Sequence, residues 1–403
     1  MTDFKAIENI CHENSRISKS VVDEFLIYYA VEQDRVDREV DKRLARYRHV
    51  TRDLPESALN FMKSQYIAWK IFRKGGLIKK YRNHQDLAHL TKEEKNYIST
   101  QAEHPWKFSF GVIINKPAEH FYRMQDVFTH ETYLLHSPGM TDILLEQPVE
   151  LWFNLIGYNG ACWQTFSLIG AWQSFEPADI MFYTSCLNPR KWIEDPSEVL
   201  QEVESNPVPY MLLISGATLP VSYHDKDQII LKFAEFLDDD FTPDALRGHF
   251  RIEYAENIYK LTPEGWEELP HFSIVYYDEK ENILLLSAMT DRGYAELIRR
   301  LNQCGYNLSD EPDHRVNITM LTTAGRILKQ NFNPVARYSS LFAEEPSMEE
   351  EMEIDKINKL MELILPDINA GRVPDSEAVA RQAGVDLETA KDLIRQIMKK
   401  LRR

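Results

Sequence analysis

The hydrophobic pattern of the chain changes its period near Pro105, and this change constrains the fold more than any other feature. Between Ser20 and Tyr47, apolar residues recur every three to four positions, as they do along one face of a helix. After Pro105, stretches such as 108–114 and 152–156 are rich in aromatic and β-branched residues, which favour strands. Because the two patterns occupy separate stretches of 403 residues, the sequence predicts an α+β protein with several domains.

The first hundred residues predict two main helices. The apolar stripe of residues 20–47 predicts one continuous helix of about eight turns. Asp53 and Glu56 have the spacing of a capping box, so a second helix is expected to start there and to end at Gly75-Gly76. Its predicted buried face consists of Leu59, Met62, Tyr66 and Trp69.

Residues 105–175 predict a compact antiparallel sheet, with the curvature of a half-barrel. Asn159-Gly160 joins two strand-like runs, and Asn-Gly tolerates the positive φ angles of a hairpin turn. Residues 126–131 indicate a second, longer hairpin turn. A helical stretch over 177–204 is expected to close this region.

Residues 207–333 mix both periods and predict helices on one side of an antiparallel sheet. We expect strands at 211–215 and 316–320, and a hairpin of 272–277 with 283–287. A helix at 294–304, capped by Asp291, and another from about Thr323 complete this region.

These patterns divide the chain into five parts. A helical basic region covers 1–104, a β-rich antiparallel domain 105–206 and an α+β domain 207–343. An acidic linker at 344–355 leads to a small helical unit at 356–403. The linker holds seven acids and no base, which indicates a solvated joint; the alternative is that it covers the basic helices until nucleic acid displaces it.

The C-terminal unit carries the one recognisable motif. Val379-Ala380, Ala383-Gly384-Val385 and Thr389-Ala390 have the small residues and the turn glycine of a helix-turn-helix, with Ser376 expected to cap its first helix. With the basic tail from Ile394, this segment resembles the helix-turn-helix at the C-terminus of bacterial sigma factors. The resemblance implies DNA contacts by Thr389, Lys391, Arg395 and Lys399.

The second helix of this motif also carries acids at Asp386, Glu388 and Asp392. Carboxylates near phosphates oppose DNA binding, so a helical module that binds another protein is the alternative reading of the unit.

Charge is strongly segregated along the chain. Fourteen Lys and Arg residues face only five acids between Arg35 and Arg82, although the net charge of the whole chain is −16. Arg35, Arg38, Lys42 and Arg46 are spaced to share one helical face. Basic residues interleaved with aromatics suit phosphate contact and base stacking. The predicted nucleic-acid contacts in this region are Arg35, Arg38, Lys42, Arg46, Lys70, Lys74, Lys79, Lys80 and Arg82. The competing interpretation pairs these cations with acids of the same chain.

Catalytic signatures are weak. The sequence has no glycine-rich nucleotide loop and no His-Glu-x-x-His, and the separations of His120, His130 and His136 fit no usual metal motif. Cys11, Cys162, Cys186 and Cys304 form no Cys-x-x-Cys pair and indicate reduced, packed thiols. We therefore expect no metal and no cofactor. An enzyme with an unrecognised site in the first sheet, with Cys162 as a candidate nucleophile, is a third interpretation.

The expected role is that of a non-catalytic binding or regulatory protein, with DNA or RNA as the first candidate ligand and another protein as the second. The chain has no long apolar run, and its first residues lack the pattern of a signal peptide. We expect a cytoplasmic protein that does not enter a membrane.

Overall fold

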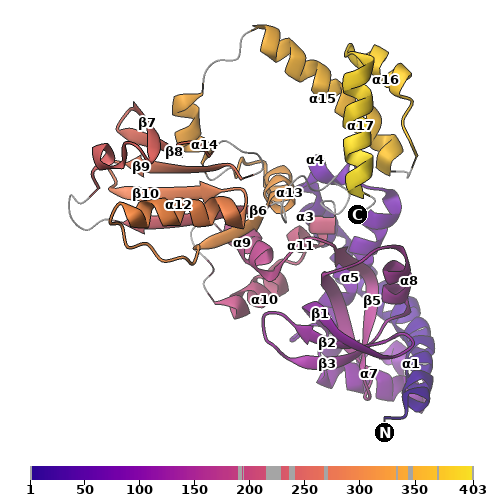
Figure 1. Ribbon diagram of the computed structural model, residues 1–403. Coiled ribbons are helices and arrows are strands. Elements are labelled where there is room, and N and C mark those ends of the chain that lie inside the picture. The colour runs from indigo at the N-terminus through magenta and orange to yellow at the C-terminus, as the bar shows by residue number, and fades with distance from the viewer. Residues whose placement is uncertain are drawn as a thin grey trace. The chain divides into compact units, whose positions relative to one another are not determined.

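The computed structural model describes residues 2–188, 193, 195–214, 228–235, 241–266, 271–332, 335–343, 348–369 and 372–401. The protein is α+β, which confirms the prediction from the two hydrophobic periods (Figure 1). The chain forms two compact units, one of residues 1–218 with 319–332 and the other of residues 219–318 with 333–403. None of the helices in the described part of the chain is both long and apolar enough to cross a lipid bilayer.

The first unit begins with a row of helices. They are α1 (Phe4–Ser18), the π-helical segment η1 (Lys19–Leu26), α2 (Ile27–Glu32), α3 (Val36–Ala45), α4 (Arg48–Thr51), α5 (Glu56–Phe72), α6 (Ile78–Tyr81), the short turn η2 (Gln85–Leu87) and α7 (Lys92–Glu103). Met62, Tyr66 and Trp69 on α5 are buried, as predicted.

The prediction of one continuous helix over 20–47 is wrong, because the chain turns between α2 and α3. Arg35 adopts a left-handed conformation with φ of 56°. The preceding Asp34 accepts hydrogen bonds from Lys80 Nζ (2.6 Å) and Tyr81 Oη (2.6 Å). Both partners lie on α6. The turn is therefore stabilised by residues distant in the sequence, and the apolar pattern of residues 20–47 gives no sign of it.

The predicted capping box at Asp53 and Glu56 is also wrong. Pro55 is the N-cap of α5, and no side chain caps this helix end. Asp53 instead accepts from Arg326 at 3.0 Å. A capping box does form at α7, where Thr91 and Glu94 exchange hydrogen bonds.

A closed five-stranded barrel follows the helices, in the order β1-β2-β3-β5-β4. Its strands are β1 (Lys107–Ala118), β2 (Phe121–Asp126), β3 (Thr132–His136), β4 (Leu151–Tyr158) and β5 (Trp163–Trp172), with helix α8 (Pro138–Glu146) between β3 and β4. All neighbouring strands are antiparallel except β3 and β5, which are parallel. The predicted sheet is confirmed, and the pairing of β3 with β5 closes it completely.

Both predicted turns of this sheet are present. Gly160 has φ of 95° in the loop between β4 and β5. In the turn between β2 and β3, the buried Asp126 accepts from Ser109 Oγ (2.7 Å) and from the backbone N–H of Phe128 and Thr129 (3.0 Å each). Local turn chemistry therefore specifies these two hairpins.

The helical end of the first unit differs from the prediction. The expected single stretch over 177–204 is two helices, α9 (Pro177–Leu187) and α10 (Pro196–Ser205). The expected strand at 211–215 is wrong: α11 (Val208–Met211) and a short turn of 3-10 helix occupy residues 208–214, and Ser215 lies outside the described residues. Pro207 is the N-cap of α11 and Pro209 lies in its first turn, where the missing N–H of a proline is tolerated. Helix α13 (Ile318–Leu328) completes the unit, with its Ile327 buried.

The second unit contains an antiparallel sheet in the order β11-β6-β10-β9-β8-β7. The strands are β6 (Gln228–Glu235), β7 (Phe250–Ala255), β8 (Ile258–Pro263), β9 (Ser273–Asp278), β10 (Ile283–Ala288) and β11 (His314–Asn317); η5 (Pro243–Leu246) precedes β7. Helix α12 (Asp291–Gln303) lies along the sheet (Figure 1). The predicted hairpin of β9 with β10 is confirmed.

The strands of this sheet are covered on both faces. Leu284 and Leu286 of β10 pack with Leu297 of α12. Leu285, which points to the opposite face, packs with Tyr338 from the segment of α14 (Ala336–Ser339) and η6 (Ser340–Phe342). The continuous apolar run of β10 follows from this double coverage.

Two helix starts in this region differ from the prediction. Thr290, not Asp291, caps α12, with its Oγ1 accepting from the N–H of Gly293 at 3.1 Å. The strand expected at 316–320 ends at Asn317, and α13 starts at Ile318 rather than near Thr323.

The C-terminal residues form three helices: α15 (Met348–Asn369), α16 (Ser376–Ala383) and α17 (Leu387–Leu401). They share an apolar core that includes Leu360, Ile364, Ala383 and Ile394. The predicted acidic linker is helical from Met348 onward, and its residues 344–347 lie outside the described ones.

Candidate functional site

A row of three cations lies along α3. Arg38, Lys42 and Arg46 are spaced four residues apart, and all three are exposed. The opposite face of the helix buries Val36, Val40 and Leu44 against the rest of the unit. Among the described residues, no acid forms an ion pair with any of the three cations, which we call the α3 stripe.

Arg35 does not belong to this stripe, which corrects the prediction of four cations on one face. It precedes α3 in a left-handed conformation, and its side chain lies 3.7 Å from Glu32. The turn between α2 and α3 therefore separates Arg35 from the regular spacing of the helix.

Lys70 is committed to a contact inside the protein. Its Nζ donates to Glu39 Oε1 at 2.9 Å, and the same oxygen accepts from Tyr66 Oη at 2.6 Å and from Arg43 at 3.3 Å. Burial raises the pKa of Glu39, but the hydrogen bonds from Tyr66 and Lys70 outweigh it and lower the pKa overall. Lys70 thus joins α5 to α3 and is removed from the surface that could meet a ligand.

The remaining predicted cations of this region divide in the same way. Lys80 pairs with Asp34 at the turn between α2 and α3. Lys74, Lys79 and Arg82 are exposed, and none of them has an ion pair with a described residue. Together with the α3 stripe, six of the nine predicted cations remain open to an external anion.

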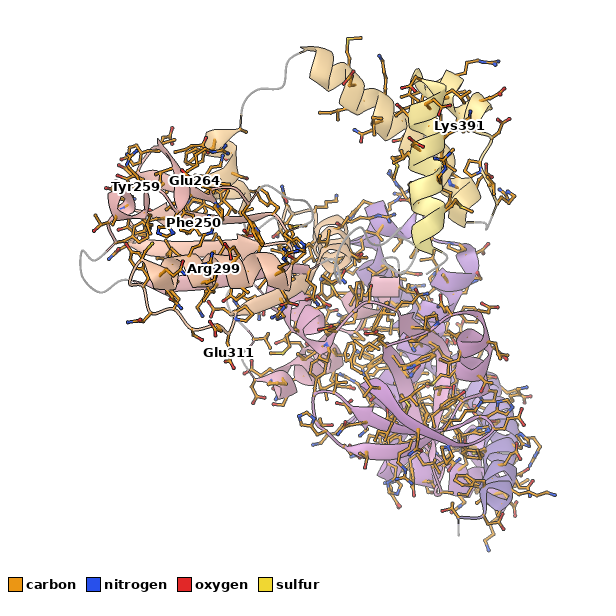
Figure 2. All side chains as sticks on the ribbon, in the orientation of Figure 1. Phe250, Tyr259, Glu264, Arg299, Glu311 and Lys391 are labelled. Atoms are coloured by element: carbon orange, nitrogen blue, oxygen red, sulfur yellow. The ribbon has the colours of Figure 1, made fainter. Side chains whose placement is uncertain are left out.

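The predicted contacts of the C-terminal unit are mostly engaged within helix α17. Lys391 lies 3.2 Å from Glu388, and Arg395 lies 2.8 Å from Asp392. Figure 2 shows Lys391 on the helices of this unit. The side chain of Lys399 lies outside the described residues.

Thr389 and Asp386 have a structural role. The carboxylate of Asp386 accepts from the backbone N–H of Thr389 at 2.8 Å and from its hydroxyl. These hydrogen bonds lower the pKa of Asp386. Asp386 therefore caps the start of α17. Helix capping gives a structural reason for an acidic residue at this position, where a carboxylate would repel a DNA phosphate.

The turn of the helix-turn-helix motif has the expected geometry. Gly384 has φ of 74° and ends α16. Asp375, not Ser376, caps the start of α16, through hydrogen bonds from the N–H groups of Glu377 and Ala378.

The histidines of the first sheet serve different positions in the barrel. His120 and His130 have φ of 60° and 58° and lie in tight turns. His136 ends β3 and is buried. Within the described ranges, no group of three or more His, Cys, Asp or Glu side chains is arranged to hold a metal ion.

A comparison with models of known protein families finds no match, and no curated protein has a matching sequence. The candidate sites therefore depend on the geometry of this chain alone.

Proposed function

We propose that the first unit binds a polyanion, with nucleic acid as the ligand, through the α3 stripe and without catalysis. The observation that carries the proposal is the absence of an acidic partner for Arg38, Lys42 and Arg46 among the described residues. This absence matters because the chain is strongly acidic overall, with 63 Asp and Glu residues against 47 Lys and Arg. An external anion would offset the repulsion within the stripe.

The geometry suits contact with a phosphate backbone. Residues four apart on a helix are displaced by about 6 Å along its axis and lie on nearly the same face. Exposed Lys74, Lys79 and Arg82 supply further cations in the same unit. Such a surface contacts the charged phosphates and not the edges of the bases, so we propose that it binds nucleic acid with little sequence preference.

The experiment is a salt series with random duplex DNA, single-stranded DNA and RNA. The change is the joint replacement Arg38→Gln, Lys42→Gln and Arg46→Gln. Each lost duplex phosphate contact should reduce the log–log salt slope by nearly one unit, and binding to every sequence should weaken.

The control removes the same charge elsewhere. Arg16, Lys280 and Arg372 are exposed, and each has an acid partner. Replacing these three with Gln should leave the slope close to that of the wild type. An equal loss of slope in both triple variants would mean that binding depends on net charge and not on the stripe.

A second candidate function belongs to the C-terminal unit, which we propose binds another protein. Lys391 and Arg395 of α17 are paired with acids of the same helix, whereas α15 exposes Met352, Ile354 and Ile357. Exposed apolar residues on one helix are typical of a protein contact. Affinity capture with the full chain and with Ile354→Asp tests this candidate, since a specific partner should be lost from the variant alone.

A further inference from the structure

Two cysteines distant in the sequence meet at the junction of α1 and the barrel. Cys11 Sγ and Cys162 Sγ lie 3.4 Å apart, although 151 positions separate them in the chain. Cys11 is on α1, and Cys162 is in the loop that joins β4 to β5. The exposed fractions of the two residues are 0% and 2%.

Asn159 directs its amide group at both sulfurs. Its Oδ1 accepts from the backbone N–H of Ala161 (2.9 Å) and of Cys162 (2.8 Å), so this end of the amide must be oxygen. The Nδ2 end therefore faces Cys11 Sγ at 3.3 Å and Cys162 Sγ at 3.6 Å. A fixed donor beside two thiols favours a thiolate at this position.

The surroundings make the two sulfurs unequal. The hydrogen bond with Cys162 is the largest influence on the pKa of Cys11 and lowers it. Burial raises that pKa, and the buried His136 lowers it again by hydrogen bonding and charge. The same contact with Cys11, together with burial, raises the pKa of Cys162. Asn159 Nδ2 also lies closer to Cys11 Sγ (3.3 Å) than to Cys162 Sγ (3.6 Å), so we assign the first attack to Cys11 and the second to Cys162.

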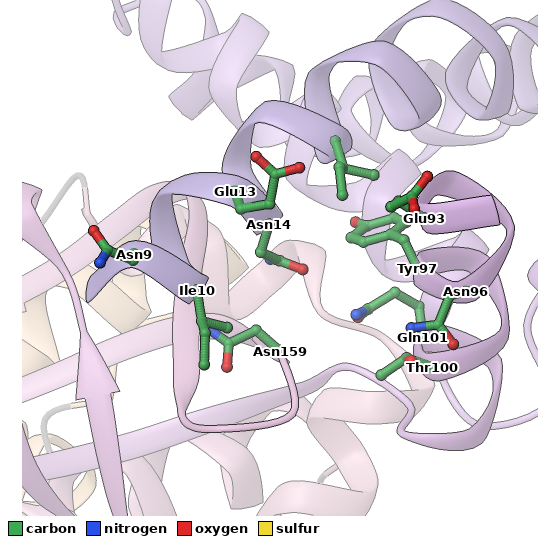
Figure 3. Close-up of a pocket in the computed structure, with 11 residues that line it drawn as sticks. Asn9, Ile10, Glu13, Asn14, Glu93, Asn96, Tyr97, Thr100, Gln101 and Asn159 are labelled. Atoms are coloured by element: carbon green, nitrogen blue, oxygen red, sulfur yellow. The ribbon is translucent and has the colours of Figure 1, made fainter. Parts of the chain in front are cut away.

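A pocket opens beside this pair, and Asn159, which contacts both sulfurs, is part of its lining. It has a volume of about 430 Å³ and lies between α1, α7 and the loop that carries Asn159 (Figure 3). Ile10 and Asn14, close to Cys11 on α1, line the same pocket. The pocket is large enough for water and small molecules, and the Asn159 side chain lies between it and the two sulfurs.

We propose that Cys11 and Cys162 are a peroxide-reactive dithiol that forms a disulfide between α1 and the barrel. The proposal depends on the contact between the sulfurs, on the donor geometry of Asn159 and on the adjacent pocket. It is independent of anion binding by the α3 stripe.

The reaction has two steps. The Cys11 thiolate attacks one oxygen of hydrogen peroxide, the O–O bond breaks, and Cys11 becomes a sulfenic acid; the released hydroxide takes up the proton that the Cys11 thiol had given up and becomes water. The Cys162 sulfur then attacks the Cys11 sulfur, the S–S bond forms, and the sulfenic hydroxyl leaves as water with the Cys162 proton. Two thiols lose two electrons in total, and one molecule of hydrogen peroxide is reduced to two of water.

The main experiment uses the reduced full-length chain and hydrogen peroxide. After treatment, remaining thiols are alkylated and the protein is digested without reductant. The expected product is a crosslinked peptide pair containing Cys11 and Cys162, while Cys186 and Cys304 are alkylated. Their thiols have pKa values raised by burial, so we expect Cys11 to react at least about tenfold faster than either. Unlinked Cys11 and Cys162, or equal oxidation of all four thiols, would overturn the proposal.

Variants separate the two roles. In Cys162→Ser, a sulfenic acid should accumulate at Cys11 and be trapped by dimedone faster than any adduct forms at Cys162 in Cys11→Ser, because the side chain of His136 lowers the pKa of Cys11. The matched control, Cys186→Ser with Cys304→Ser, should form the crosslink at the wild-type rate. The assignment of Cys11 as the nucleophile would be contradicted if the dimedone adduct formed equally fast in the two variants, at Cys162 in Cys11→Ser and at Cys11 in Cys162→Ser. The wild-type peptide map needs no variant, so the proposal is tested even if a substitution prevents folding.

Discussion

At the scale of single residues, Gly384 occupies a backbone conformation that residues with a Cβ atom rarely adopt. Its φ of 74° lies in the left-handed region, and a Cβ built there would meet no described heavy atom within 4 Å. The positive φ confirms the expectation from the sequence, whereas the expected close packing at this position is not found. The cost of a larger residue should therefore come from backbone strain alone.

We expect Gly384→Val to destabilise the C-terminal helices by about 1–2 kcal/mol, because a β-branched residue is strained at positive φ. Hydrogen exchange of the full chain measures this, since the amides of α16 and α17 should lose protection while those of the barrel stay unchanged. Gly384→Asn is the control, because Asn tolerates the left-handed region and should cost only a fraction of that amount. Equal protection in the valine variant and the wild type would show that this φ is not required.

At the scale of elements, helix α12 is fixed to the second sheet by a compact charge cluster. Glu296 accepts from Arg299 (2.6 Å) and from Arg300 (2.6 Å). Arg300 also donates to the carbonyls of His249 (2.7 Å) and Glu264 (2.9 Å). The hydrogen bond from Arg299, helped by that from Arg300, lowers the pKa of Glu296 from 4.5 to about 2 in spite of burial.

The lowered pKa predicts a dependence of stability on pH. The Glu296 contacts stabilise the folded state fully above pH 4.5, and this stabilisation is lost as the pH falls toward about 2. At neutral pH, Glu296→Gln should cost roughly 1–3 kcal/mol, because it removes hydrogen bonds to a charged group. Urea unfolding at several pH values should show the difference from wild type shrinking below pH 4.5. Glu281→Gln, at an exposed and loosely paired position, should change little at any pH.

The elements predicted correctly from the sequence are those fixed by local chemistry. The hairpin over residues 159–162 and the turn at Asp126 follow from residues within a few positions of each other. The break before α3 could not be predicted in this way, because Asp34 is held by Lys80 and Tyr81. Because this break was not predicted, Arg35 was wrongly placed on the same helical face as Arg38, Lys42 and Arg46.

At the scale of the whole molecule, contacts between segments distant in the sequence determine features of the fold that the local sequence pattern does not specify. The parallel pairing of β3 with β5 closes the barrel, and α13 joins the first unit although the second sheet precedes it in the chain. The contact of Cys11 with Cys162 is of the same kind. Spacing rules consider neighbouring residues, so they could not place these two thiols together.

The C-terminal helices should fold without the rest of the chain. The described residues buried in their shared core come from α15, α16 and α17, and include Leu360, Ile364, Val379, Ala390 and Ile397. A fragment from Met348 to Arg403 contains all of these described core residues. We expect it to be helical by circular dichroism and to unfold cooperatively in urea. Its stability should be small, on the order of 3–5 kcal/mol or less, because a domain of this size buries little apolar surface.

Ile364→Ala provides the decisive comparison for this fragment. Its side chain is fully buried at the centre of the three helices. The substitution should cost about 2–5 kcal/mol, which is enough to unfold the isolated fragment. The control Glu362→Ala changes a residue of the same helix outside that core and should leave the urea midpoint nearly unchanged. If the wild-type fragment were unfolded, the three helices would need the remainder of the chain to fold. The C-terminal unit could then not be an independent module that binds another protein.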